Sequence, residues 1–117
     1  MRYFFATLSV CLLAADISPV SLVAAGRVVT LAGNGRAAYT GDGGPASRAT
    51  IGGPFGVSLG PDGALYVCEI NNHCVRRIDR QTGLISTVAG SGKQGYAGDG
   101  GPATAALCNE PYEIRFD

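Results

Sequence analysis

The chain has 117 residues, of which 46% are apolar, and nine basic residues balance nine acidic ones. This length allows one ordinary domain at most, the charge balance argues against nucleic-acid binding through a basic surface, and the apolar content argues against charge-driven disorder. Glycine makes up about 15% of the chain, roughly twice its usual share, but it does not recur at every third position, which excludes collagen.

The first 25 residues have the pattern of a secretory signal. Arg2 precedes an uncharged apolar run from Phe4 to Ala15, which is shorter than the roughly 20 residues that a membrane-spanning helix needs. Small residues at Val23 and Ala25 predict cleavage after Ala25. We therefore expect export to the periplasm, the cell surface or the medium, with no stable membrane span after cleavage. An uncleaved N-terminal anchor is the alternative.

The rest of the chain repeats itself at a spacing of 57 residues, without a gap. Such self-similarity is typical of repeat architectures. The second copy ends at Asp117, which corresponds to Gly60. The matched ranges are Thr30–Gly33 with Thr87–Gly90, Tyr39–Ala46 with Tyr96–Ala103, and Gly53–Phe55 with Glu110–Tyr112.

Residues 55–89 show the pattern of four short strands joined by tight turns. Pro61, Asp62 and Gly63 favour a hairpin turn, because proline presets φ, aspartate caps the turn and glycine accepts positive φ. Asn71 and Asn72 mark the next loop. Residues 103–107 have room for one helical turn. The expected strands are 55–59, 64–69, 74–79 and 84–89, which would form an antiparallel meander.

Repeated four-stranded meanders are typical of β-propeller blades. The motifs Pro54–Val57, Asp62-Gly63, Leu65–Val67 and Asn71–Arg76 together resemble the NHL repeat of NHL-type β-propellers. The Gly-Asp-Gly-Gly-Pro-Ala stretches resemble the inter-blade loop of bacterial exported members. The resemblance implies an all-β fold in which residues 26–117 form part of a propeller, with one complete four-stranded blade at about 55–89 and partial blades on either side.

The incomplete second copy bears on the organisation of the chain, because a blade buries its faces only against neighbours. NHL-type rings usually have about six blades, so we expect a fragment of a larger NHL-repeat protein. Two alternatives are self-association of copies to complete a ring and an unusual monomeric β-domain.

The motif residues are expected to be structural rather than catalytic. His73, the sole histidine, belongs to the repeat signature; a metal site with its neighbouring cysteines would be incomplete, because zinc sites normally take at least three protein ligands. Asp42 and Asp99 are expected to cap turns, because calcium loops need more oxygen ligands than each turn offers. The sequence therefore predicts no catalytic, metal-binding or cofactor-binding residue. The predicted structural residues are Pro54, Asp62, Gly63, Asn71, Asn72, His73, Asp42 and Asp99.

Two further groups of side chains leave alternatives open. Cys68 and Cys74 flank a five-residue loop, and they are expected either to form a disulfide or to remain buried free thiols; Cys108 is left over in both cases. The cluster of Arg76, Arg77, Asp79 and Arg80 is expected to be a solvated blade edge with local ion pairs, and the alternative is a site for an anionic ligand or an acidic protein surface.

Together these observations predict an exported, non-catalytic propeller segment that binds a protein or small ligand, or acts as a scaffold, through its loops. The alternative is a remnant of a propeller hydrolase or lyase with a metal in the central channel. Enzymatic activity is the less favoured of the two.

Overall fold

A computed structural model describes residue 26 and residues 28–117. The predicted secretory signal, residues 1–25, lies outside the described residues. In the part of the chain that is described, no helix is long and apolar enough to cross a membrane.

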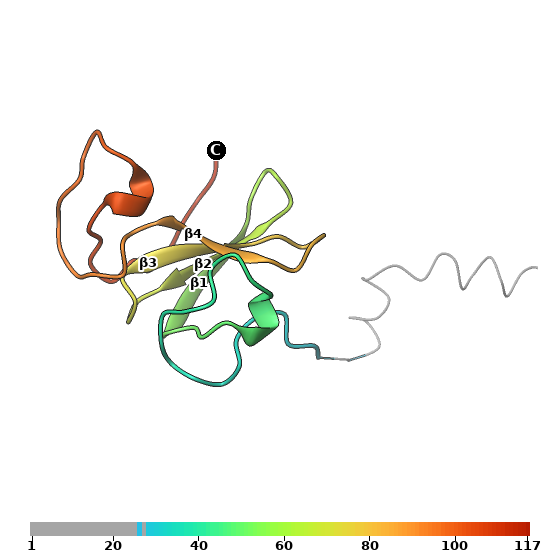
Figure 1. Cartoon of the computed structure of the whole chain (residues 1–117). Coiled ribbons are helices and arrows are strands. Elements are labelled where there is room, and N and C mark those ends of the chain that lie inside the picture. Colours follow the sequence, from blue (N-terminus) through green and yellow to red (C-terminus); the bar gives the residue numbers. More distant parts are fainter. Residues whose placement is uncertain (1–25, 27) are drawn as a thin grey trace, which may run out of the picture.

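The described residues form one antiparallel sheet of four strands in sequential order (Figure 1). This confirms the predicted all-β fold, and each predicted strand end lies within one residue of the observed one. One-turn 3-10 helices precede β1 and follow β4; the second lies where a helical turn was expected, whereas its repeat equivalent in the first copy was not foreseen. The elements are η1 (Ala46–Arg48), β1 (Pro54–Leu59), β2 (Leu65–Glu69), β3 (Cys74–Ile78), β4 (Ile85–Ala89) and η2 (Ala103–Ala105).

Aspartates organise two of the turns between strands. Between β1 and β2, Oδ1 of Asp62 accepts from the N–H of Ala64 at 3.2 Å, and Gly63 takes φ of +76°. The hydrogen bond that Asp62 accepts from Arg77 is the main cause that lowers the pKa of Asp62. Between β3 and β4, the N–H groups of Thr82 and Gln81 lower the pKa of Asp79 by hydrogen bonding. Both carboxylates therefore hold their turns in the ionised form.

Strand register divides the side chains between two faces of the sheet. Val67 lies opposite Arg76, and Cys68 lies opposite Val75. Because successive side chains of a strand point to opposite faces, Val67 and Arg76 share one face, which we call the first face, while Cys68 and Val75 lie on the second face.

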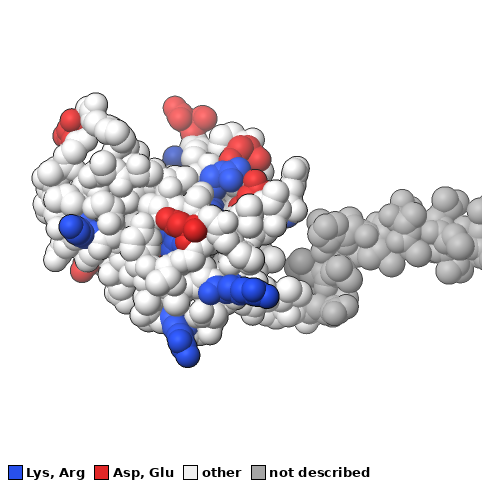
Figure 2. Space-filling view, viewed as in Figure 1, with Lys and Arg blue, Asp and Glu red and all other residues white. Residues whose placement is uncertain are grey.

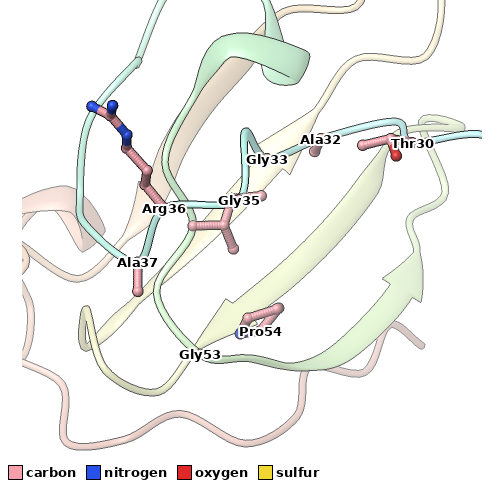
Figure 3. A pocket seen from close by; sticks show the side chains of 9 residues that line it. Thr30, Ala32, Gly33, Gly35, Arg36, Ala37, Gly53 and Pro54 are labelled. Atoms are coloured by element: carbon pink, nitrogen blue, oxygen red, sulfur yellow. The ribbon is translucent and has the colours of Figure 1, made fainter.

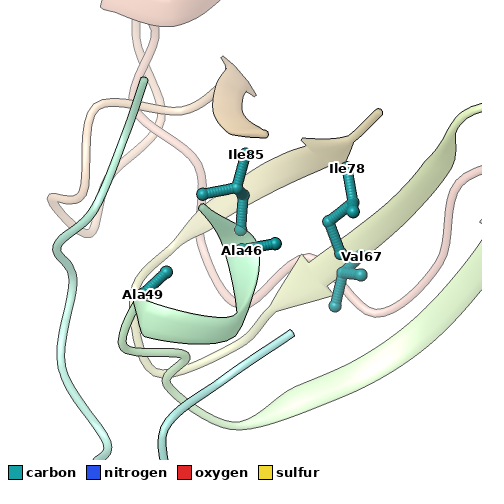
Figure 4. Close-up of a cluster of buried hydrophobic side chains, with 5 residues drawn as sticks. All are labelled: Ala46, Ala49, Val67, Ile78 and Ile85. Carbon is teal, nitrogen blue, oxygen red and sulfur yellow. The ribbon is translucent and has the colours of Figure 1, made fainter. Parts of the chain in front are cut away.

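The first face is covered by the glycine-rich chain that precedes β1. We call residues 33–53 the first linker segment and residues 90–110, its repeat equivalent, the second linker segment. Small residues of the first linker segment pack on apolar residues of the sheet (Figure 4), and this cluster is the core. Its members are Ala46, Ala49, Val67, Ile78 and Ile85.

The second face lies against the C-terminal residues 112–116. The rings of Phe55 and Tyr112 meet edge to face at 4.6 Å between centroids, and those of Tyr66 and Phe116 do so at 4.8 Å. Oγ of Ser58 donates to the carbonyl of Ile114 at 2.7 Å. The sheet therefore has other parts of the chain packed on both faces. The first linker segment lies on the first face. Residues 112–116, which correspond to β1 in the second copy of the repeat, lie on the second face.

Candidate functional site

A buried charge cluster lies on the first face, where β2 and β3 meet the first linker segment. The side chains of Arg76 and Glu69 are both completely buried, and their Nη1 and Oε1 atoms are 3.1 Å apart. Nη2 of Arg76 is 2.8 Å from Oδ1 of Asp42, whose side chain is 45% exposed. The expectation of a solvated arginine cluster is therefore wrong for Arg76, because the first linker segment folds over it.

Further contacts hold the first linker segment on Arg76. Its guanidinium donates to the carbonyl of Thr40 at 3.2 Å and lies 5.2 Å from the ring centroid of Tyr39. The hydroxyl of Thr87 in β4 donates to Oδ2 of Asp42 at 2.7 Å and is 2.8 Å from that of Tyr39. Asp42 thus joins two strands of the blade to the linker, and its carboxylate accepts from Arg76 and Thr87 rather than from a backbone N–H of its own turn, so the predicted turn cap is wrong for Asp42.

Glu69 connects the arginine to the start of β1. Its Oε2 accepts from the N–H of Gly52 at 2.9 Å and from the side-chain amide of Asn72. That amide also donates to the carbonyl of Ala38 at 2.7 Å. A Cβ on Gly52 would lie 2.6 Å from the amide of Asn72, so this position accepts only glycine without rearrangement. The cluster is fully hydrogen-bonded, as a buried ion pair requires.

The other predicted motif residues lie around the same end of the blade. Pro54 begins β1 opposite Glu69, and Asn71 donates its N–H to the carbonyl of Gly52 at 3.2 Å. His73 has φ of +49°, and its Nδ1 accepts from the N–H of Glu110 at 3.1 Å. The structure thus brings the Asn71–His73 loop between the two linker segments. The turn residues Asp62 and Gly63 are at the opposite end of β2.

Asp99, the repeat equivalent of Asp42, is exposed and lies apart from this cluster. Among the described residues it forms no ion pair.

The cysteines do not form the disulfide that was considered between Cys68 and Cys74. All three described cysteines are free thiols. The register pairs Cys68 with Val75 and Cys74 with Glu69, so the two thiols lie on opposite faces of the sheet. Burial is the main cause that raises the pKa of Cys74 to about 12, and burial also raises the pKa of Cys68. Neither environment activates a thiolate nucleophile.

A shallow pocket of about 400 Å³ lies between residues 30–37 and the start of β1 (Figure 3). In the second copy of the repeat, the place equivalent to this pocket is filled by neighbouring residues. A Cβ on Gly92 would lie 2.6 Å from the ring of Tyr39, whereas nothing lies within 4 Å of one on Gly35, its equivalent in the pocket. Likewise Gly90 abuts the carbonyl of His73, whereas Gly33 meets only Ile51. The pocket thus has the shape of a contact with a preceding blade.

In the part of the chain described, no three His, Cys, Asp or Glu side chains are grouped as metal ligands. Arg77 pairs with Asp62 at 2.8 Å and with Asp79 at 3.5 Å at the turn end of the sheet. Acidic and basic side chains are interspersed on the face shown in Figure 2. The Arg77–Asp62 pair joins the turn between β1 and β2 to β3.

Comparison with known proteins is consistent with this geometry. No family model matches the chain. Over 71 residues, or 60% of its length, it is 33% identical to NHL repeat-containing protein 2 of Gallus gallus and 34% identical to that of Homo sapiens. The chain spans about a tenth of the length of these curated relatives.

A solved structure gives a second comparison. A structural-genomics protein of unknown function from Bacteroides thetaiotaomicron VPI-5482 superposes with a TM-score of 0.58 at 27% sequence identity, over 74% of this chain and 21% of that one. Together, the sequence similarity and the all-β sheet support a relationship to the NHL-repeat family and are consistent with an NHL-type β-propeller blade.

Proposed function

We propose that this chain is an exported, non-catalytic segment of an NHL-type β-propeller with a binding or scaffold role. The observation that carries the proposal is the blade with the first linker segment on its first face and the segment equivalent to β1, residues 112–116, on its second face. This is the arrangement of a blade between neighbours, since propeller blades repeat around a central channel.

The surface of β1 supports a role in binding. Val57 and Leu59, which lie on the same face of β1, are both 59% exposed, and exposed apolar residues that adjoin one another mark interaction sites. Propellers present their binding groups on the ring and its loops. The occupant we propose is a protein or small ligand that contacts β1 and the loops at its ends.

Metal analysis tests the non-catalytic part of the proposal. The purified chain is dialysed against Zn²⁺ and Ca²⁺, and bound metal is counted by mass spectrometry beside a His73→Ala variant. We expect less than stoichiometric metal in both proteins. One zinc or calcium ion per chain that is lost in the His73→Ala variant would overturn the proposal in favour of a metal-dependent hydrolase or lyase.

Export is tested by the mass of the mature protein in its source cells. We expect intact mass spectrometry to show a chain that begins at Gly26 and is recovered outside the cytoplasm. A full-length chain that stays in the cytoplasmic fraction would contradict export.

A further inference from the structure

We infer that the second linker segment and residues 111–116 form a preformed docking surface for one more blade. The occupant is a three-stranded antiparallel meander that pairs with residues 111–116 and whose middle strand carries an arginine for Asp99. This inference rests on the proposed propeller role and names the contacts by which the next blade is held.

The second linker segment has the same backbone conformation as the first. Gly41 and its equivalent Gly98 have φ of +95° and +103°. Pro45 and Pro102, which precede η1 and η2, agree within 2° in φ and ψ. The bond from Gly33 N–H to the carbonyl of Ala46 recurs between Gly90 and Ala103, both at 2.9 Å. The second segment therefore holds the docking conformation without a blade against it.

The first linker segment shows which contacts this conformation serves. Besides the Asp42–Arg76 pair, the N–H of Gly43 donates to the carbonyl of Ile85 at 2.7 Å, and the N–H of Ala46 donates to that of Gly83 at 2.8 Å. Ala46 is fully buried by these contacts. They form a mixed backbone and ionic interface to the outer strands of the blade.

In the second linker segment, the same groups face open space. Ala103, the equivalent of Ala46, is exposed, and Tyr96 is 85% exposed against 37% for Tyr39. Among the described residues, the N–H groups of Gly100 and Ala103 have no backbone partner. Figure 1 shows the loop that carries η2 extending beyond the end of β4, which η2 contacts, whereas η1 lies against the face of the sheet. An acidic side chain and aligned backbone donors are thus presented together, complementary to an arginine-bearing blade.

Residues 111–116 supply the first strand of that blade. They match β1 at the repeat spacing and lie alongside it through the Ser58–Ile114 bond. In the described part of the chain no strand pairs with them, although β1 itself pairs with β2. Their open edge is suited to addition of a strand. The occupant that fits both features has the chemistry of residues 61–89, with a glutamate at the end of its first strand.

The test appends a copy of Pro61–Ala89 after position 117. Asp117→Gly is included at the junction, because a Cβ at the equivalent Gly60 would lie 2.4 Å from Tyr66. In the extended chain we expect Asp99→Asn to lower Tm by about 4–8 °C, the shift that roughly one lost charge-assisted contact produces in a domain of this size. In the 117-residue chain the same substitution is expected to leave Tm unchanged.

Two controls make the result specific. Asp42→Asn is expected to lower Tm in both chains, and Arg→Gln in the appended copy of Arg76 is expected to remove the effect of Asp99→Asn. Hydrogen exchange adds an independent readout, because the amides of Gly100 and Ala103 should become protected only in the extended chain.

An equal effect of Asp99→Asn in both chains, or unprotected amides in an extended chain whose appended strands are ordered, would overturn the inference. Neither outcome affects the metal test above, so the proposed function and the docking surface fail separately.

Discussion

Arg76 connects the blade to the first linker segment, so its replacement measures how much this contact contributes to the free energy of unfolding. Arg76→Gln leaves Glu69 buried without its cation, and breaking a buried ion pair in this way costs about 3–5 kcal/mol. Arg77→Gln breaks only the partly exposed pairs with Asp62 and Asp79, and we expect a loss below about 1 kcal/mol. Urea unfolding of the two variants measures both free energies.

The comparison keeps its meaning if Arg76→Gln does not fold at all. Far-ultraviolet circular dichroism then reports the loss, while Arg77→Gln retains the spectrum of the parent protein. Equal stability of the two variants would contradict the role assigned to Arg76.

The thiols offer a second prediction at this scale. A pKa raised from 9.0 to about 12 lowers the thiolate fraction of Cys74 at pH 8 roughly a thousandfold, and the thiolate is the reactive form. We expect iodoacetamide to modify half-buried Cys108 well before Cys74 or Cys68, as followed by peptide mass spectrometry. Denaturant should make the rates similar. Rapid labelling of Cys74 in the native protein would contradict its described burial.

Sequence reasoning is best suited to residues whose role is local. The backbone geometry of the turn at Asp62 and Gly63 depends on neighbours within four residues, so it is visible in the sequence, whereas the bond from Arg77 to Asp62 spans 15 residues and is not. The burial of Arg76 depends on its contact with Asp42, which lies 34 residues earlier. No local sequence pattern predicts that these two residues come together. The recurrence of Tyr39 and Asp42 at the repeat spacing, as Tyr96 and Asp99, was the available signal that Asp42 has a role outside its own turn.

At the scale of elements, the two linker segments provide a matched pair of glycines. Gly35 and Gly92 both have positive φ, of +85° and +81°, so alanine at either position adds a similar backbone strain of about 1 kcal/mol. Only at Gly92 does the new Cβ meet a neighbour, the ring of Tyr39 at 2.6 Å. We therefore expect Gly92→Ala to destabilise the protein clearly more than Gly35→Ala.

Thermal unfolding of both alanine variants checks this expectation. An equal fall in Tm would mean that Tyr39 moves aside freely, and that the second linker segment is not packed against the first as described. A larger fall for Gly35→Ala would contradict the open pocket at that position.

The elements themselves follow from the sequence because their determinants are short in range. Turn residues bound each strand, and β-branched residues fill β4, so strand positions are predictable to within one residue. The arrangement of the linkers is different. Their glycine-rich sequence specifies a conformation, seen twice with nearly equal angles, but the face they cover is decided by the blade.

For the whole molecule, the strands that the chain contains determine which assemblies its copies can form. Residues 28–32 correspond to β4 of a preceding blade, and residues 111–116 correspond to β1 of a following one. If two copies met end to end, these segments would be the outer and inner strands of a shared blade. Strands equivalent to β2 and β3 would be missing from it, and with them the buried Arg76 and Glu69 of that blade.

We therefore expect self-association without a closed ring. Exposed apolar side chains at both ends, such as Val28 at 97% and Tyr96 at 85% exposure, favour weak contacts between copies, but no contact supplies the two missing strands. Sedimentation velocity of the mature chain over a range of concentrations should show a monomer that broadens into mixed oligomers. A single ring-sized species of fixed stoichiometry would contradict this expectation, because it would require the open edges to satisfy each other without β2 and β3.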